Sequence, residues 1–517
     1  MSDSAGSPNV FYKFLRLFTD IRPGETTKAL LLALNLFLLL LAYYLIKPVR
    51  EALLLVNEDA PRTKSYLSGA QAFLFVFVIL AFSLLASKVP RHKLITWVTL
   101  FFISNLVIFY ILHLAGIGAG AMGIAFFIWI GIFNYLVVAQ FWGFANDLYT
   151  FEVGKRIFPL IAFGATLGAV TGSRIAKLII EPFGKFNVML LSGAVLGVCI
   201  LMAVLIHRRE VRSPQSGGRP DAHLQEKPLK PGDGFSLVAK TRYLLYIALA
   251  ILVYNFINTN GEYIISDVAT RSGEKAWNAP VSKLKELNLE WFQERDLNQD
   301  GHLAGQEIPD DKVLDRMDDN KNKVITLQEA HDSYVGGYNG KFFSEYQFLT
   351  NILALVIQLF LVSRIFRWVG VGGALFVLPF IALGGYAFIS LGATLLLVKW
   401  VKSLENGTDY SLMNTVKAAL FLVTSREEKY KAKAAIDTFF VRAGDALAAL
   451  AVFVGTTFLA MNIEKFAILN IVFVLIWLFL VYLIIRQYRL KKAQQGAVPA
   501  GEPVVVKPPA RPKNIYK

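Results

Sequence analysis

Oxygen-bearing side chains recur in one stretch of the sequence at the spacing of a calcium-binding loop. The stretch contains Asp296, Asn298, Asp300, Gly301, His302 and Glu307. They fill positions 1, 3, 5, 6, 7 and 12 of an EF-hand, whose oxygen ligands alternate because the loop wraps around the ion. Gly301 permits the sharp turn, and Glu307 can supply both carboxylate oxygens. We therefore predict a calcium site in this loop.

A second loop repeats the pattern, starting 22 residues later (318 − 296). Its ligands would come from Asp318, Asn320, Asn322, Val324 and Glu329. Lys323 stands where glycine is usual, so we expect a strained turn and a weaker site. Leu303 and Ile325 fill the apolar positions through which sister loops pair. The residues fit a pair that calcium orders structurally, and also a degenerate pair that folds without metal.

The rest of the chain is long and apolar enough to lie in a membrane. Hydrophobic residues make up 55% of the 517 residues, and they come in long blocks such as Lys28 to Ile46. About 20 residues of this kind cross a bilayer as a helix, and we count about twelve such blocks. The predicted fold class is therefore an all-α membrane protein with about twelve transmembrane helices. The two calcium loops form a small EF-hand pair inserted between spans 7 and 8.

The blocks are arranged as two six-helix halves. Six precede residue 207 and six follow residue 240, with a polar, basic linker between them, which is typical of major-facilitator-like transporters. A short repeat supports this, because residues 85–91 and 361–367 occupy equivalent places and both read Leu-x-Ser-basic-aliphatic-x-Arg. The expected boundaries are an N-terminal half at 1–206, the linker at 207–240, span 7 at 241–267, the insert at 268–341, the remaining spans at 342–487 and a disordered tail at 488–517.

The distribution of charge sets the orientation and limits the partners. The formal net charge is +15, but the basic residues cluster at the ends of spans, which indicates orientation in a bilayer rather than nucleic-acid binding. Short loops after even-numbered spans are basic, so we expect both termini and the linker in the cytoplasm and the insert outside it. No cleavable signal or transit peptide is visible, which favours a bacterial plasma (inner) membrane. The single cysteine, Cys199, can form no internal disulfide or zinc site.

Ionisable residues within the apolar blocks are the candidate binding residues, because a charge inside a bilayer is costly. They end the first block, lie late in the seventh, form a polar stripe in the tenth and occur inside the eleventh. The candidates are Lys47, Arg50, Glu51, Glu262, Lys402, Asp409, Lys417, Asp437 and Arg442. Gly261 suggests a helix break beside Glu262, as is common at transporter sites. Each cluster also has a structural interpretation: a snorkelling cation, a loop-edge carboxylate, a re-entrant loop or an ion pair between helices.

Several longer motifs resemble the ATP/ADP translocases, the nucleotide transporters of plastids and intracellular bacteria. Residues 140–173 are similar to the family's Phe-Trp-Gly-Phe-Ala-Asn segment, residues 409–422 to its Tyr-Ser-Leu motif, and residues 431–445 to its Lys-Ala-Ala-Ile-Asp motif. The sequence KPVRE at 47–51 stands where the family has a basic and acidic cluster. The resemblance implies that Arg50, Glu262 and Lys417 serve nucleotide exchange. The fourth span departs from the family pattern, with Ile130 in place of a glutamate and Asn134 one turn on, and the insert is not typical of the family.

The leading hypothesis is exchange or uptake of nucleotides by alternating access, with calcium as a structural ion of the insert. Lys47, Arg50, Lys402 and Lys417 would bind phosphates, and Glu262 and Asp409 would keep the empty site near neutrality. One alternative is a facilitator for another organic anion or a phosphorylated metabolite. Another is a non-transporting membrane protein whose calcium domain binds a partner. No phosphate loop, nucleophile elbow or metal-hydrolase motif is present, so an enzyme is not expected. We expect a monomer.

Overall fold

The computed structural model describes residues 25–56, 59–86, 89–117, 119–149, 151–212, 233–279, 287–318, 320–424, 428 and 432–496. Almost all of these residues are helical, and the described part of the chain contains a single two-stranded sheet. Lys88 of the short repeat, most of the predicted linker and the end of the predicted tail lie outside the described residues.

The first half consists of long helices that follow the apolar blocks. They are α2 (Thr26–Leu54), α3 (Ala60–Ala86), α4 (Arg91–Leu114), α5 (Ala119–Leu148), α6 (Phe151–Phe183) and α7 (Lys185–Arg212). Helices form here because a chain within a bilayer must satisfy its backbone hydrogen bonds internally. Pro48 lies inside α2, which nevertheless continues to Leu54. Lys47, Arg50 and Glu51 therefore occupy one continuous helix.

The second half begins after the short helix α8 (Asp233–Lys240) and is less regular. Its elements are α9 (Arg242–Trp277), α12 (Leu327–Val356), η4 (Ile357–Leu361), α13 (Val362–Leu391), α14 (Leu395–Thr408), η5 (Asp409–Met413), α15 (Asn414–Leu420), η6 (Phe421–Val423), α16 (Lys433–Ala435), η8 (Ile436–Phe440), α17 (Val441–Thr457) and α18 (Ile463–Gly496). Three of the short segments, η4, η5 and η8, are turns of π-helix. Such turns interrupt membrane helices and occur often at functional sites.

Nine stretches of the described residues are long and apolar enough to cross a membrane. One of them, Leu327–Leu391, has 65 residues and changes direction at Gly370, whose φ of +64° is not helical. The α14–α15 segment is not among the nine; it carries Lys399, Lys402, Glu405 and Asp409. The chain is thus a multi-pass, all-α membrane protein, whereas a count of twelve spans stays a prediction.

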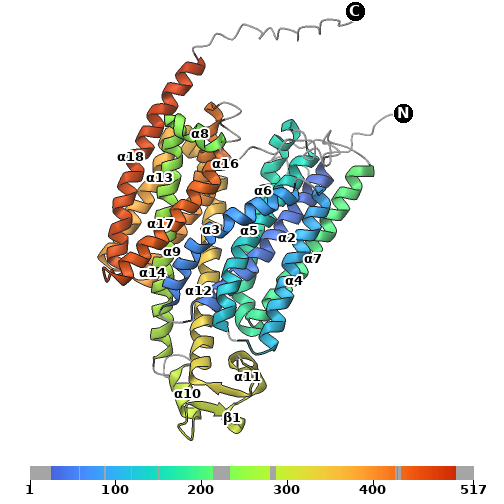
Figure 1. Cartoon of the computed structure of the whole chain (residues 1–517), viewed down its shortest axis with the longest axis vertical. Coiled ribbons are helices and arrows are strands. Elements are labelled where there is room, and N and C mark those ends of the chain that lie inside the picture. Colours follow the sequence, from blue (N-terminus) through green and yellow to red (C-terminus); the bar gives the residue numbers. More distant parts are fainter. Residues whose placement is uncertain are drawn as a thin grey trace, which may run out of the picture.

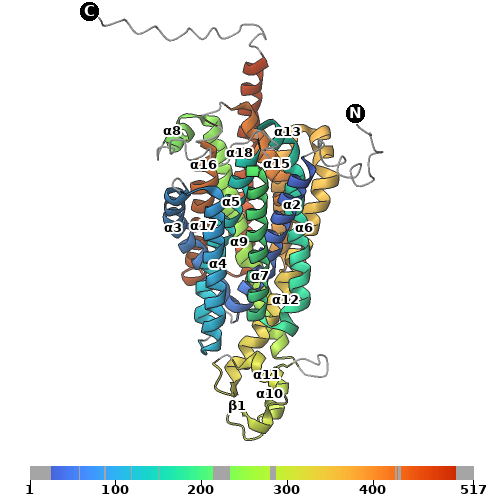
Figure 2. The same cartoon turned by 90° about the vertical axis from the view of Figure 1, so that its right-hand side faces the viewer.

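The two halves stand side by side in Figure 1 and overlap in the perpendicular view of Figure 2. They meet closely where small residues face one another. An added Cβ on Gly336 or Gly340 of α12 would touch Ala52 of α2, and one on Gly69 of α3 would touch Ala449 of α17. The halves therefore pack backbone against backbone near the ends of α2 and α3, in the way that small residues allow membrane helices to approach.

The insert lies at the opposite end of the molecule from α8 and the end of α18 (Figure 1). It comprises α10 (Leu289–Arg295), β1 (His302–Ala304), η3 (Gly305–Glu307), α11 (Asp311–Met317) and β2 (Val324–Thr326). The strands are antiparallel, and Leu303 pairs with Ile325 as the sequence predicts. Both side chains are fully buried, so the two loops share a small core with Trp277, Phe292 and Tyr334.

Several predicted boundaries fall inside helices. The predicted insert limits, 268 and 341, lie within α9 and α12, which extend past the apolar blocks into the insert. Similarly, α18 stays helical to Gly496, beyond the predicted start of the tail at 488. The reason is that a helix satisfies its own hydrogen bonds and can continue in water after the hydropathy falls.

Candidate functional site

A cavity of about 240 Å³ lies between the two halves. Its walls come from α2, α3 and α5 of the first half, and from α9, α12, α14, η5 and α17 of the second. Four cations line it, Lys47, Arg50, Lys64 and Arg442, together with three acids, Glu51, Glu262 and Asp445. Aromatic rings from both halves complete the wall, among them Tyr43, Tyr44, Phe127, Tyr346 and Tyr410.

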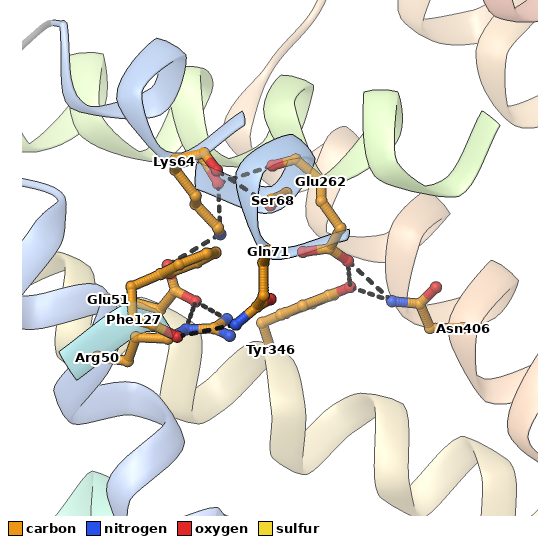
Figure 3. A network of polar contacts seen from close by, with 10 residues as sticks. Arg50, Glu51, Lys64, Ser68, Gln71, Phe127, Glu262, Tyr346 and Asn406 are labelled. Atoms are coloured by element: carbon orange, nitrogen blue, oxygen red, sulfur yellow. Dashed lines mark hydrogen bonds and ion pairs between the residues drawn. The ribbon is translucent and has the colours of Figure 1, made fainter. Parts of the chain in front are cut away.

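The first half contributes a buried ionic cluster of Arg50, Glu51 and Lys64. Arg50 Nε donates to Glu51 Oε1 over 2.9 Å, and its Nη2 reaches the same oxygen. Lys64 Nζ lies 2.8 Å from the other oxygen, Oε2. Glu51 is only 1% exposed, so it needs both cations, because a buried charge without a partner is strongly destabilising. Figure 3 shows the three side chains converging on the Glu51 carboxylate.

The second half places Glu262 at the cavity wall. Glu262 Oε1 accepts hydrogen bonds of 3.1 Å from the Tyr346 hydroxyl and from Asn406 Nδ2. Asn406 also donates to the Tyr346 oxygen over 2.6 Å, which closes a small ring of polar groups (Figure 3). Within the described residues Glu262 takes part in no ion pair, and neither does Lys47.

Gly261 serves a different purpose from the predicted helix break. The helix α9 runs unbroken from Arg242 to Trp277, so that prediction is wrong. A Cβ at Gly261 would lie 2.2 Å from the Tyr386 oxygen and 2.8 Å from Lys402 Nζ. Glycine is present because α13 and α14 bring polar side chains directly against the α9 backbone.

Lys402 belongs to a polar cluster behind the cavity. Lys402 and Glu405 are both fully buried and form an ion pair of 3.0 Å. The lysine also donates to Asn258 Oδ1 over 3.0 Å, and the Tyr386 hydroxyl donates to Glu405 Oε2 over 3.0 Å. Asn258 lines the cavity, whereas Lys402 and Glu405 do not. The pair therefore supports the wall and contacts the cavity through Asn258.

Five of the nine predicted binding residues line the cavity, and four do not. Those that line it are Lys47, Arg50, Glu51, Glu262 and Arg442. Those outside its wall are Lys402, Asp409, Lys417 and Asp437. Asp409 pairs with Lys417 at 3.1 Å, and Asp437 with Lys433 at 2.5 Å. The Asp437 pair joins residues four apart in one segment rather than two helices, and a binding role for these four residues stays a prediction.

Some residues that line the cavity were not among the predicted binding residues, and Lys64 is the most important of them. It precedes the second apolar block by one turn, so in the sequence it looks like an ordinary lysine at the membrane interface. Asp445 is paired with Arg442 at 2.9 Å and accepts from Thr259 at 2.7 Å. The spacing of three between Arg442 and Asp445 was a signal for their pairing, but no signal marked Lys64.

The two loops of the insert share one pattern of hydrogen bonds. Asp296 accepts from the backbone N–H groups of Asp300 and Gly301, at 3.1 and 2.9 Å. Asp318 accepts from Asn322 and Lys323 in the same way, at 3.2 and 2.8 Å. Glu307 and Glu329 each close their loop by accepting from two backbone N–H groups. The position-12 glutamates thus face back into loops of like shape.

The expected strain at Lys323 is present. Its φ is +65°, in the left-handed region that side chains other than glycine rarely adopt. Gly301, at the equivalent position of the first loop, has φ +77°. In the part of the chain that the structure describes, no three His, Cys, Asp or Glu side chains gather as a metal site. Calcium in either loop therefore stays a prediction.

Comparisons with known proteins agree with the motifs. A family model described as TLC ATP/ADP transporter matches residues 124–262. ADP,ATP carrier protein 1 of Chlamydia pneumoniae is 22% identical over 353 residues, which cover 61% of this chain and 57% of that carrier. ADP,ATP carrier protein 1 of Chlamydia muridarum (strain MoPn / Nigg) is 21% identical over 509 residues, which cover 86% of this chain and 84% of that carrier. The match to the first carrier therefore spans little more than half of its length.

Solved transporters share the fold at low sequence identity. A mutant of the nucleoside transporter NupG has a TM-score of 0.57 and 12% identity, over 88% of this chain and 99% of its own. A POT family transporter in complex with 5-aminolevulinic acid has a TM-score of 0.55 and 12% identity, over 87% of this chain and 96% of its own. The matched family and all these proteins are transporters, which agrees with the lack of enzyme motifs.

Proposed function

From its resemblance to the TLC ATP/ADP transporter family, we propose that this membrane transporter exchanges or takes up nucleotides. The observation that carries the proposal is the cavity between the halves, because both cations and aromatic rings line it. A nucleotide needs both kinds of group, because its phosphates are anionic and its base is a flat ring.

Lys47 is the cation most available to a phosphate. It contacts the rings of Tyr43 and Tyr44, with Nζ 5.9 and 5.3 Å from their centroids, and it forms no ion pair with a carboxylate of the described residues. Arg50 lies one turn further along α2 and can bind phosphate oxygens in a bidentate manner. In a site shielded from water these attractions are stronger than at the surface.

The tyrosines offer a surface for the base. Tyr43, Tyr44, Tyr346 and Tyr410 come from α2, α12 and η5, so both halves contribute rings. Stacking of a base on a ring tolerates different bases, because each base has a π-face. The Tyr346 hydroxyl and the Asn406 amide add hydrogen bonds beside Glu262.

Transport would proceed by alternating access, with the halves rocking about the cavity. Contacts between the halves cluster at the end of the molecule that carries the insert. They include the hydrogen bond from Asn339 to the Leu55 carbonyl, 2.8 Å, and the ion pair of Lys177 with Glu345. The protein would lie in a bacterial inner membrane, with termini in the cytoplasm and the insert outside.

Calcium would order the insert as a structural ion. The side chains that would hold it are Asp296, Asn298, Asp300 and Glu307 in the first loop, and Asp318, Asn320, Asn322 and Glu329 in the second, with backbone carbonyls of His302 and Val324. The donors are all oxygens, as calcium requires, and in both loops a backbone N–H group donates to the first aspartate in the same way, which supports a paired calcium domain. Bound calcium would hold the ligands of each loop together and would take no part in moving the cargo.

The size of the cavity favours a second candidate cargo. Its volume of about 240 Å³ lies below the roughly 300–1,000 Å³ of drug-sized ligand sites. A nucleotide requires the cavity to widen when the halves move, whereas a small phosphorylated metabolite or another organic anion needs less widening. The same cations would bind either cargo.

Reconstitution separates the two candidates. Vesicles that contain the purified protein and internal ADP are given labelled ATP, and uptake is measured with and without internal ADP. We expect uptake that internal ADP stimulates and that Lys47→Gln reduces at least tenfold. The matched control is Lys93→Gln, which changes an exposed lysine at the start of α4, outside the cavity wall, and should transport like the parent protein.

The outcomes decide between the candidates. No ATP uptake, together with uptake of a small phosphorylated metabolite, would replace the nucleotide proposal by the second candidate. Equal loss of activity in Lys47→Gln and Lys93→Gln would show that the cavity is not the binding site.

A further inference from the structure

Lys64 contacts both the cavity and the opposite half of the protein. It belongs to α3, its Nζ lies 2.8 Å from Glu51 Oε2 on α2, and it donates to the Ser266 hydroxyl on α9 over 2.8 Å. Its ammonium also faces the Phe343 ring of α12, at 4.8 Å. The first of these partners is in its own half, and the other two are in the second half.

Several other contacts between the halves stand apart from the cavity. Tyr66 contacts Thr456 over 3.4 Å, and Asn339 contacts Leu55, but none of these four residues lines the cavity wall. Arg442 does line it and reaches the ring of Phe75, yet its carboxylate partner Asp445 is on its own helix. Lys64 is therefore well placed to convert binding in the cavity into a change at the interface.

The Glu51 carboxylate is bound by two cations at once. Its two carboxylate oxygens are each paired with a different cation, Oε1 with Arg50 and Oε2 with Lys64. A phosphate also presents several oxygens and binds the same two kinds of cation, with more charge. The Glu51 carboxylate thus occupies an anion site formed by Arg50 and Lys64.

We propose that Arg50 and Lys64 form the phosphate subsite of the cavity, that Glu51 is its internal occupant in the empty carrier, and that a cargo phosphate displaces Glu51 and draws Lys64 away from Ser266. This rests on the proposed function only in requiring a phosphate-bearing cargo. We call the hydrogen bond between Lys64 and Ser266 the latch. When it breaks, the two halves can separate at the insert end.

The groups left behind can be accommodated. The Ser266 hydroxyl already donates to the Glu262 carbonyl over 2.7 Å, so it keeps a partner when Lys64 leaves. The displaced Glu51 carboxylate gains water, since about 240 Å³ holds several molecules at roughly 30 Å³ each. A neutral ligand cannot compete for the two cations. The latch therefore responds to phosphate, and the empty carrier stays closed at the insert end, which favours exchange over one-way release.

The first test measures affinity in the full-length protein. Glu51→Gln keeps the shape of the side chain but removes the charge that competes with phosphate. We expect pyrophosphate and ADP to bind at least fivefold more tightly to Glu51→Gln than to the parent protein in isothermal titration, whereas adenosine, which has no phosphate, changes by less than twofold. Unchanged or weaker pyrophosphate binding by Glu51→Gln protein that is folded at the temperature of the titration would overturn the proposal.

The second test measures the latch. Spin labels on Leu114→Cys and Phe458→Cys report the separation of the halves at the insert end, in a Cys199→Ala background; both sites are exposed, at 56% and 70%. Pyrophosphate should widen the distance distribution in the parent protein. Ser266→Ala should widen it without ligand and should bind pyrophosphate more tightly than the parent protein, because phosphate then no longer has to break the Lys64–Ser266 bond.

Tyr66→Phe is the matched control, because it removes a contact between the halves that does not line the cavity. In this variant pyrophosphate should still be needed for full widening. A Ser266→Ala protein that stays closed, or a Tyr66→Phe protein that opens as far as Ser266→Ala without ligand, would contradict the latch. If the parent protein binds pyrophosphate and opens but does not transport nucleotides, the subsite stands and the nucleotide proposal fails.

Discussion

The insert and the cavity both hold charged groups, but they gather them differently. In the insert, Asp296 and Glu307 belong to one loop and bond to backbone N–H groups within it. In the cavity, Arg50, Lys64 and Glu262 come from α2, α3 and α9, and the last two lie almost 200 residues apart (262 − 64 = 198). A local site can be recognised by spacing, whereas a site between helices depends on how the helices pack.

The two regions also differ in exposure, and this decides what a substitution does. Asp296 and Glu307 take part in exposed hydrogen bonds, which water can replace. Glu51, Lys402 and Glu405 are buried at 1%, 0% and 0% exposure, where removing one partner leaves a charge without compensation. We therefore expect substitutions in the membrane region to affect stability, and those in the insert to affect mainly ion binding.

The largest effect is expected for Lys402→Ala. The substitution leaves Glu405 buried with only the Tyr386 hydroxyl beside it, and breaking a buried pair in this way costs about 3–5 kcal/mol. The free energy of unfolding in detergent measures the loss. Lys399→Ala is the matched control: its partner Glu345 is less buried than Glu405 and keeps a second cation, Lys177, so the loss should be smaller. Equal losses would remove the distinction between buried and accessible pairs.

Calcium removal should have the next largest effect, confined to the insert. A ligand at 100 times its Kd stabilises the folded state by about 2.7 kcal/mol, so a calcium chelator should lower the unfolding temperature of the parent protein. Glu307→Gln should abolish most of this response, and Glu329→Gln less of it, because we expect the strained second loop to bind calcium more weakly. Insensitivity of the parent protein to chelator would favour the pair that folds without metal.

Gly261→Ala tests the close packing of the membrane region. Its Cβ would fall 2.2 Å from the Tyr386 oxygen, and overpacking of this kind costs about 1–3 kcal/mol. Gly384→Ala, on α13, meets nothing within 4 Å and should be neutral or slightly stabilising. The two unfolding curves measured side by side check the difference, and overlapping curves would argue against the close approach of α13 and α14 to α9.

Lys323→Gly should have the smallest effect and the opposite sign. It removes a side chain from a residue with φ +65°, which should raise the free energy of unfolding by about 1–2 kcal/mol. The extra entropy of glycine in the unfolded chain lowers it again by about 0.5–1 kcal/mol. We expect a stability gain of a few tenths to 1 kcal/mol and tighter calcium binding in the second loop, read by titration in a Glu307→Gln background. Weaker calcium binding would show that the lysine does not limit the loop.

Much of the fold was predictable because it depends on local properties. Apolar blocks of bilayer length predicted α2, α4 to α7, α9 and α18, and the EF-hand spacing predicted the pairing of Leu303 with Ile325. The helix ends were less predictable, since α9 and α12 continue past their apolar blocks. The helix break predicted at Gly261 was wrong because a glycine can mark either a break in a helix or a close approach of another helix. Only the packing of the neighbouring helices distinguishes the two.

The sequence by itself determined that the chain crosses a membrane, that it carries paired loops of EF-hand spacing and that it resembles the ATP/ADP transporters. Each of these features depends on residues that are close together in the sequence. Tertiary structure alone decided which charges share a cavity. It placed Lys64 beside Glu51 and Ser266, and it placed Lys402 and Asp437 elsewhere. The physical reason is that a buried charge is satisfied by whatever packs against it, and partners on separate helices leave no periodic trace in the sequence.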